Sequence, residues 1–172
     1  RNRAIAIIIT LLCLVAAPSF GQTDKRIDSL ENELSKKIQD STRVSLLTDL
    51  ADAFTFLDFR KSFDYAKQAV ELANEINNYK LKISANRMLG SNYSLEGNYT
   101  TAINYEAKCL QLALAHNDSS SMGLSHSNIG NYYHELGEYD EAYYFLTQGY
   151  KILQSSAKNL NDSINMNIAL HN

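Results

Sequence analysis

The most reactive side chains of this sequence are four histidines and Cys109; the second cysteine, Cys13, lies within an apolar run near the N-terminus. His126 and His134 lie eight residues apart on one predicted helix, a spacing that turns their side chains about 80° away from each other. No cysteine or carboxylate completes a ligand set at the spacing of a zinc site, and His116 and His171 stand apart from both. Nothing in the sequence indicates a base or a cleft that would activate Cys109. We therefore expect no metal and no cofactor, with the histidines on the surface or in a groove and Cys109 packed in the core.

The motifs of the common enzyme classes are also missing from the sequence. It contains no P-loop, no Gly-rich dinucleotide-binding turn and no nucleophile elbow. The net charge is −3 and no basic stripe is present, which argues against nucleic acid as a partner. We expect this stretch of chain to bind a partner rather than to catalyse a reaction.

Two polar stripes could supply the chemistry of binding. Each follows i, i+4, i+7 spacing, which places three side chains on one face of a helix. Arginine and asparagine side chains can hydrogen-bond the backbone or a carboxylate of an extended peptide, and we expect Arg87 and Asn131 to point away from the core. The alternative is that these side chains are simply solvated. The stripes are Arg87, Ser91, Ser94 and Ser127, Asn131, His134, and an earlier helix offers Thr48, Asp52 and Thr55.

A 40-residue repeat organises the helices that carry these residues. Shifting the sequence by 40 brings aromatic, aliphatic, small and glycine residues into matching columns, which is the signature of a repeat architecture. Pro18 is the only proline, so the rest of the chain reads as helices joined by short turns. The columns are Phe59, Tyr99, Tyr139; Tyr65, Tyr105, Phe145; Leu72, Leu112, Ile152; Ser62, Ala102, Ala142; Ala69, Cys109, Gly149; and the pairs at 90 and 130, 93 and 133, 97 and 137.

Each repeat unit is predicted to be a helix, a tight turn and a second helix. The turns at Gly97 and Gly137 need a left-handed residue, whereas the first unit has no glycine at 58–60 and should turn differently. Asp118 and Asp162 are expected N-caps, as are residues 40–42. The units are 42–78, 79–118 (helices 83–96 and 99–116), 119–160 (helices 121–136 and 139–154) and a partial unit 161–172, preceded by an N-terminal helix at 24–39 within residues 22–41.

Gly90 and Gly130 are predicted to lie in the middle of helices, where glycine costs about 1 kcal/mol relative to alanine. A close crossing of the two helices of a unit would explain them, because no side chain fits at such a crossing. The small residues Ser62, Ala102 and Ala142 would face the same crossing from the second helix.

These residues carry a resemblance to the tetratricopeptide repeat (TPR) family. Gly90-x-x-Tyr93 and Gly130-x-x-Tyr133, each followed by Gly-x-Tyr-x-x-Ala, resemble the TPR signature. The sequence departs from it in lacking the usual Trp and the closing Pro and in its longer period. The resemblance implies an all-α, TPR-like α-solenoid of antiparallel helix pairs, wound as a right-handed superhelix, whose first helices line a concave face.

An N-terminal signal-like segment is followed by a helix with the residues Ile27-Asp28-Ser29-Leu30 and then by Asp40-Ser41-Thr42-Arg43-Val44, leading into Leu50-Ala51. This succession resembles the start of bacterial TPR sensor proteins. Arg1 and Arg3 precede an apolar run and Pro18, so residues 1–21 look like a signal peptide cleaved before Gln22; an uncleaved membrane anchor is the alternative. Cleavage would take the net charge from −3 to −5, because it removes two arginines and no acid. We expect a secreted or periplasmic location. We expect the protein to contact a membrane only through this segment or through a region beyond position 172.

The function expected from these features is binding of a protein or peptide partner. The family resemblance implies an extracytoplasmic sensory or interaction module of a bacterial signalling protein, followed beyond Asn172 by an output module such as a histidine kinase. The chain is accordingly expected to be the N-terminal piece of a longer protein. The alternative is a structural spacer or dimerisation module, for which a homodimer is expected and no ligand is needed.

Overall fold

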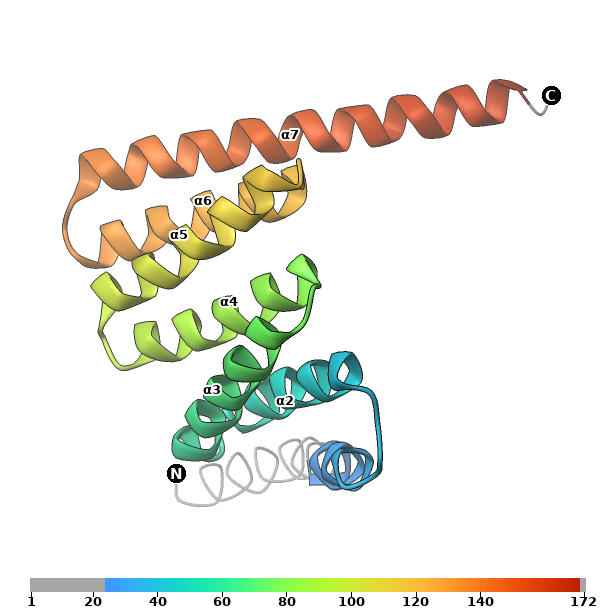
Figure 1. Cartoon of the computed structure of the whole chain (residues 1–172). Helices are drawn as coiled ribbons and strands as arrows, with labels where there is room; N and C mark the ends of the chain where they lie inside the picture. The colour runs from blue at the N-terminus through green and yellow to red at the C-terminus, as the bar shows by residue number, and fades with distance from the viewer. Residues whose placement is uncertain (1–23, 171–172) are drawn as a thin grey trace, which may run out of the picture.

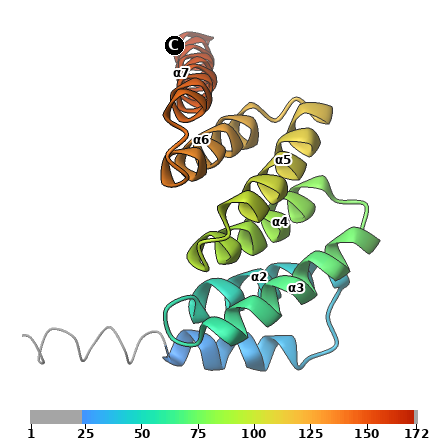
Figure 2. The ribbon, with the colours of Figure 1, turned by 90° about the vertical axis from the view of Figure 1, so that its left-hand side faces the viewer.

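Helices alone form the described part of the chain. The computed structural model describes residues 24–170, with side chains as far as residue 158, and no strand occurs within this range. The helices lie one above another in antiparallel succession from the N-terminal helix to α7 (Figures 1 and 2). They are an N-terminal helix at 24–34, then α2 (Asp40–Phe54), α3 (Phe59–Glu75), α4 (Tyr79–Leu95), α5 (Tyr99–Ala115), α6 (Ser119–Glu135) and α7 (Tyr139–Leu170). The all-α fold predicted from the sequence is confirmed, and the predicted signal peptide lies outside the described residues.

Capping side chains fix where four of the helices begin. α3, α5 and α7 start 40 residues apart, as do α4 and α6. A capping oxygen accepts a backbone N–H from the first turn and satisfies a donor that has no partner within the helix. The prediction that Asp118 caps a helix is confirmed, and α4 and α6 begin earlier than predicted because their caps stand at 78 and 118. The caps are Asp58, Asn78, Asn98 and Asp118, before α3, α4, α5 and α6.

Glycine makes the tight turns of the second and third units. Gly97 and Gly137 have φ values of 78° and 81°, in the left-handed region that glycine enters without strain. The N–H of Gly97 donates to Ser94 and that of Asn98 donates to Tyr93, which closes the end of α4. The predicted left-handed conformation of both glycines is confirmed.

The first unit turns differently, as predicted, but at residues 55–58 rather than 58–60. Asp58 caps α3, so the following residues are already helical. No residue of this turn has a positive φ. The stretch between the stacked aromatic residues is one residue shorter than in the second unit: Phe54 stacks on Tyr65 at 5.8 Å and Tyr93 stacks on Tyr105 at 5.5 Å, although the first pair is 11 positions apart and the second pair 12. The 40-residue period therefore becomes 39 for α2.

The glycines inside α4 and α6 mark close helix crossings, as predicted. A Cβ on Gly90 would lie 3.0 Å from the Tyr105 Cβ and 3.5 Å from the Ala102 carbonyl oxygen. A Cβ on Gly130 would lie 2.7 Å from the Leu146 Cγ and 3.1 Å from the carbonyl oxygen of Ala142, which is buried. The small residues of α5 and α7 thus face these crossings.

Three predicted helix ends are wrong. The N-terminal helix ends at 34 rather than 39. α2 begins after Gln39, which makes no side-chain capping bond, so residues 40–42 are part of the helix instead of its cap. α7 continues through Leu170, without the predicted end at Gln154 or the N-cap at Asp162 where a fourth unit was expected to begin. Residues 150–170 contain neither glycine nor proline, so nothing interrupts the helical hydrogen bonds.

Candidate peptide-binding groove

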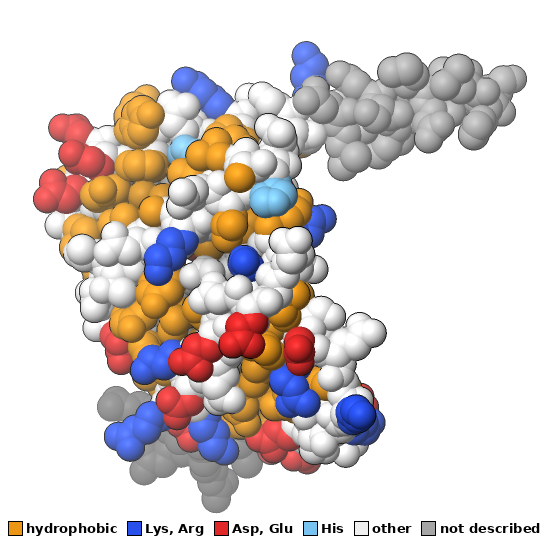
Figure 3. All heavy atoms as spheres, in the orientation of Figure 1, with side chains coloured by type: hydrophobic (Ala, Val, Ile, Leu, Met, Phe, Trp, Pro, Cys, Tyr) orange, Lys and Arg blue, Asp and Glu red, His pale blue; other side chains and the backbone are white. Residues whose placement is uncertain are grey.

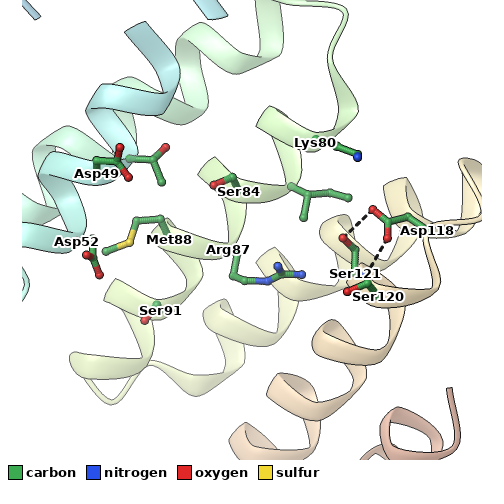
Figure 4. Close-up of a pocket in the computed structure, with 12 residues that line it drawn as sticks. Asp49, Asp52, Lys80, Ser84, Arg87, Met88, Ser91, Asp118, Ser120 and Ser121 are labelled. Atoms are coloured by element: carbon green, nitrogen blue, oxygen red, sulfur yellow. Dashed lines mark hydrogen bonds between the residues drawn. The ribbon is translucent and has the colours of Figure 1, made fainter. Parts of the chain in front are cut away.

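A hollow of about 650 Å³ lies where α2, α4 and the start of α6 meet. It is lined mainly by the first helices of successive pairs, as expected for the concave face of stacked repeats. Charged side chains of both signs are present in its walls, and Met88 lies between them (Figure 4). The lining side chains are Thr48, Asp49 and Asp52 of α2, Lys80, Ile83, Ser84, Arg87, Met88 and Ser91 of α4, and Asp118, Ser120 and Ser121 at the start of α6.

Four of the candidate residues taken from the sequence line this hollow. Thr48 and Asp52 of α2 lie opposite Arg87 and Ser91 of α4. With the 39-residue offset of α2, Thr48 is the structural equivalent of Arg87 and Asp52 that of Ser91. The two stripes on α2 and α4 are therefore equivalent faces of successive units.

The stripe on α6 does not face the hollow. Ser127 donates to the Gly123 carbonyl at 2.9 Å, and its Oγ lies 2.6 Å from where a Cβ on Gly149 would stand. Glycines at 123 and 149 let α7 approach this serine, so it faces a helix crossing. Asn131 and His134 are exposed, and the ring of His134 lies 5.5 Å from the ring of Tyr139 at the turn into α7. The α6 stripe therefore does not line the same hollow as the α4 stripe, and a role of its residues in binding stays a prediction.

Ser94 and Thr55 occupy equivalent places at the ends of α4 and α2, and neither lines the hollow. The Ser94 hydroxyl donates to the Ser91 carbonyl at 2.8 Å, and the Thr55 hydroxyl to the Ala51 carbonyl at 3.0 Å. Both hydroxyls are thus engaged by the backbone of their own helices, and the groove is shorter than the sequence stripes indicate.

A buried charge network lies behind Arg87. Glu106 of α5 is fully buried, and its Oε1 lies 3.5 Å from Arg87 Nε. The same oxygen accepts a hydrogen bond of 2.7 Å from Asn128, while Arg87 Nη2 donates to the Ser125 hydroxyl at 3.2 Å. The network joins α4, α5 and α6. The sequence analysis predicts that Arg87 points away from the core. This prediction is wrong, because the side chain points toward buried Glu106.

Arg87 is the counterion that lets a carboxylate remain in the core. A buried charge is costly unless it is paired and hydrogen-bonded. Glu106 Oε2 has no hydrogen-bond partner in the described part of the chain, so the carboxylate depends on Arg87 and Asn128 through its other oxygen. Sequence reasoning missed Glu106, although the signal was available: its column holds Ala66 and Leu146 in the neighbouring units.

Fixed charges also surround the start of α6. The pKa of Asp118 is lowered, chiefly by the backbone N–H of Ser121, then by the Ser121 hydroxyl and by the nearby cations Lys80 and Arg87. Burial opposes this shift but does not overcome it. Asp118 is thus a stable anion that caps α6 and faces the cations of α4.

Cys109 is buried against α4, as predicted. Its S–H donates to the Ile83 carbonyl at 3.4 Å, and burial raises the pKa of the thiol to about 12. A thiolate is the reactive form, so this side chain is a packing residue. Within residues 24–158, no three or more His, Cys, Asp or Glu side chains come together as a metal would require. No described helix combines the length and the apolar character needed to cross a membrane.

The fold is shared with solved TPR proteins, whereas no family model and no curated protein matches the sequence. The apo form of RapI aligns with 80% of this chain at 20% identity and a TM-score of 0.69, and the chain spans 40% of its length. The TPR domain of Arabidopsis FLU aligns with 68% of this chain at 22% identity and a TM-score of 0.63, and the alignment covers 99% of that domain. A signal-transduction ATPase from Pyrococcus horikoshii with a TPR sensor aligns with 83% of this chain at 20% identity and a TM-score of 0.72, and the alignment covers 22% of the ATPase chain. The chain thus has the TPR-like solenoid fold that its glycine and tyrosine columns predict.

Proposed function

We propose that this chain is a protein- or peptide-binding scaffold and that its partner binds in the hollow between α2, α4 and the start of α6. The observation that carries the proposal is the hollow itself, which presents charged groups and serine hydroxyls from helices of successive units. Such side chains can hydrogen-bond the backbone and side chains of an extended segment. A Rap protein with a similar fold, at 17% identity and a TM-score of 0.69, was solved in complex with competence and sporulation factor.

Filling the hollow tests this function. Ser84 is exposed and lines the hollow, so Ser84→Trp should block it without disturbing the core. Thr100→Trp places the same bulk on an exposed position of α5 outside the hollow and serves as the control. Peptides selected from a random-sequence library on the wild type should bind Ser84→Trp at least about tenfold more weakly, a loss of about 1.4 kcal/mol, and bind the control normally. Equal binding of the peptides to all three proteins would refute the proposal that the partner binds in the hollow.

The setting we propose is extracytoplasmic, as the sensory or interaction module of a bacterial signalling protein. It rests on the predicted signal peptide at 1–21 and on the resemblance of the N-terminus to TPR sensor proteins. Residues 1–21 fused to an enzyme that is active only outside the cytoplasm should give activity in bacteria, and the mature chain should begin at Gln22. A cytoplasmic, unprocessed fusion would refute this part of the proposal.

A dimerisation module is the second candidate, favoured by the surface of α7. Hydrophobic side chains gather over the end of the molecule where α7 begins (Figure 3). Tyr139, Tyr143 and Tyr150 are 66%, 74% and 64% exposed, and their spacing places them on one side of the helix. Pairing of two chains through this side would hold an output module in a dimer without any ligand. A chain that remains monomeric at high concentration in light-scattering measurements would exclude this candidate.

A further inference from the structure

The α2 wall of the hollow is acidic. Asp49 and Asp52 lie one helical turn apart on the side of α2 that faces α4 (Figure 4). Both are exposed, and Asp49 forms no ion pair within the described chain. Asp52 pairs with Arg26 at 3.2 Å, but both side chains are at least half exposed, so water screens this pair and its contribution is small. The two carboxylates therefore remain available to a ligand.

The cations of the hollow are already opposed by carboxylates of the protein. Arg87 pairs with buried Glu106 at 3.5 Å. Lys80 lies near Asp118, the anion that caps α6. Lys80 forms no ion pair within the described chain, but the charge of Asp118 offsets its own, so the acids of α2 set the sign of the net charge in the hollow. A cationic group gains from this arrangement, whereas an anionic group would be repelled by the acids of α2.

The surface between the two walls suits an aliphatic side chain. Met88 reaches from α4 toward the two aspartates, and the hydroxyls of Ser84 and Ser91 stand on the same helix (Figure 4). Lysine and arginine cover apolar surface with their methylene stems while the charged head seeks a carboxylate. A stem laid over Met88 would bring the head to Asp49 and Asp52.

We infer that the ligand of this groove is an extended peptide segment with a lysine or arginine side chain, whose stem covers Met88 and whose cationic head binds Asp49 and Asp52. The inference rests on the proposed function and names the class of peptide that the same hollow takes. The serine hydroxyls of α4 then remain for the peptide backbone.

The test begins with the same selection of peptides from a random-sequence library. Peptides that lose binding on Ser84→Trp are the groove binders, and we expect them to be enriched in lysine and arginine over the input library. Their dissociation constants are then measured by fluorescence anisotropy on wild type and on Asp49→Asn/Asp52→Asn, with helicity checked by circular dichroism. Loss of two exposed ion pairs should weaken binding by about 2- to 30-fold.

A matched control separates a local contact from an effect of net charge. Asp64→Asn/Glu71→Gln removes the same charge from exposed positions of α3 outside the hollow, and we expect it to leave the affinity nearly unchanged. Replacing the basic residue of the peptide by norleucine should weaken binding to wild type but have little further effect on Asp49→Asn/Asp52→Asn.

The possible failures are distinguishable. Groove binders without an excess of lysine or arginine, or groove binders that bind Asp49→Asn/Asp52→Asn as tightly as wild type, would overturn this inference and leave the proposed function standing. A selection in which no peptide is sensitive to Ser84→Trp would overturn both. Equal weakening by the α3 control would show that only net charge acts, and would also overturn the inference.

Discussion

Arg87→Met removes the counterion of a buried carboxylate while keeping an unbranched apolar side chain in place of the arginine stem. At 3.5 Å and an effective dielectric constant of about 20, the attraction between Arg87 and Glu106 amounts to about 5 kcal/mol. The arginine side chain is 26% exposed, so water screens part of this attraction, and the hydrogen bond from Asn128 to Glu106 survives the substitution. We therefore expect the free energy of unfolding to fall by about 3 kcal/mol, at the lower end of the range for breaking a buried ion pair.

Urea unfolding of the whole chain, followed by far-ultraviolet circular dichroism, measures this loss. The melting temperature should fall by about 6–12 °C. Adding Glu106→Gln to Arg87→Met should recover more than half of the loss, because a neutral amide needs no counterion and still accepts from Asn128. Lys80→Met, which removes an exposed cation from the same helix, should cost less than about 1 kcal/mol. A similarly small cost for Arg87→Met, or no recovery with Glu106→Gln, would refute the account of the network.

Four further predictions test the packing, the capping and the surfaces. Gly130→Ala should lower the free energy of unfolding by about 1–3 kcal/mol in urea titrations despite the higher helix propensity of alanine, since its Cβ would lie 2.9 Å from a backbone nitrogen of α7. Asp118→Ala should lower the free energy of unfolding by about 1 kcal/mol at neutral pH. Because the pKa of Asp118 is lowered in the folded state, its contribution to stability is complete above the unfolded value of 3.8 and should vanish in a pH series as the pH falls through the folded pKa. The thiol of Cys109 should react with a thiol reagent only after unfolding, as its pKa of about 12 and its burial require. Tyr143→Glu/Tyr150→Glu should abolish any self-association seen by light scattering, because it charges the exposed side of α7.

Much of the fold could be predicted because its determinants are local in the sequence. The capping aspartate at 118, the left-handed glycines at 97 and 137 and the crossing glycines at 90 and 130 each act on their own turn or helix pair. The predicted end of the last helix is wrong because a local stop signal is missing. The prediction takes an aspartate as the cap of a new helix, although no glycine or proline ends the preceding helix.

The site could be predicted only in part, because it depends on how separate helices approach each other. Ser127 is the equivalent of Arg87 in sequence, yet glycines on α6 and α7 turn it into a contact at a helix crossing. The pairing of Arg87 with Glu106 depends on the fit of α4 against α5, which spacing along one helix does not reveal. The sign of this pairing that the sequence offers is the charged residue Glu106 in a column that is otherwise apolar.

The shortened stretch from Phe54 to Tyr65 shapes the groove. It contains no glycine like those at 97 and 137, and it offsets α2 from the 40-residue columns by one residue. With the 39-residue offset, Asp49 takes the place of Met88 in the next unit and Asp52 that of Ser91. An acid thus stands in α2 where its equivalent in α4 is apolar, and the hollow between the two helices acquires one acidic wall and one wall whose cations lie near carboxylates of the protein. Inserting a glycine before Asp58 would restore the spacing of 12 positions seen between Tyr93 and Tyr105. It would have to rotate α2 or slide it along its axis, because the stack of Phe54 on Tyr65 fixes the present register. The recognition chemistry proposed for this groove therefore depends on the point where the repeat departs from its own period.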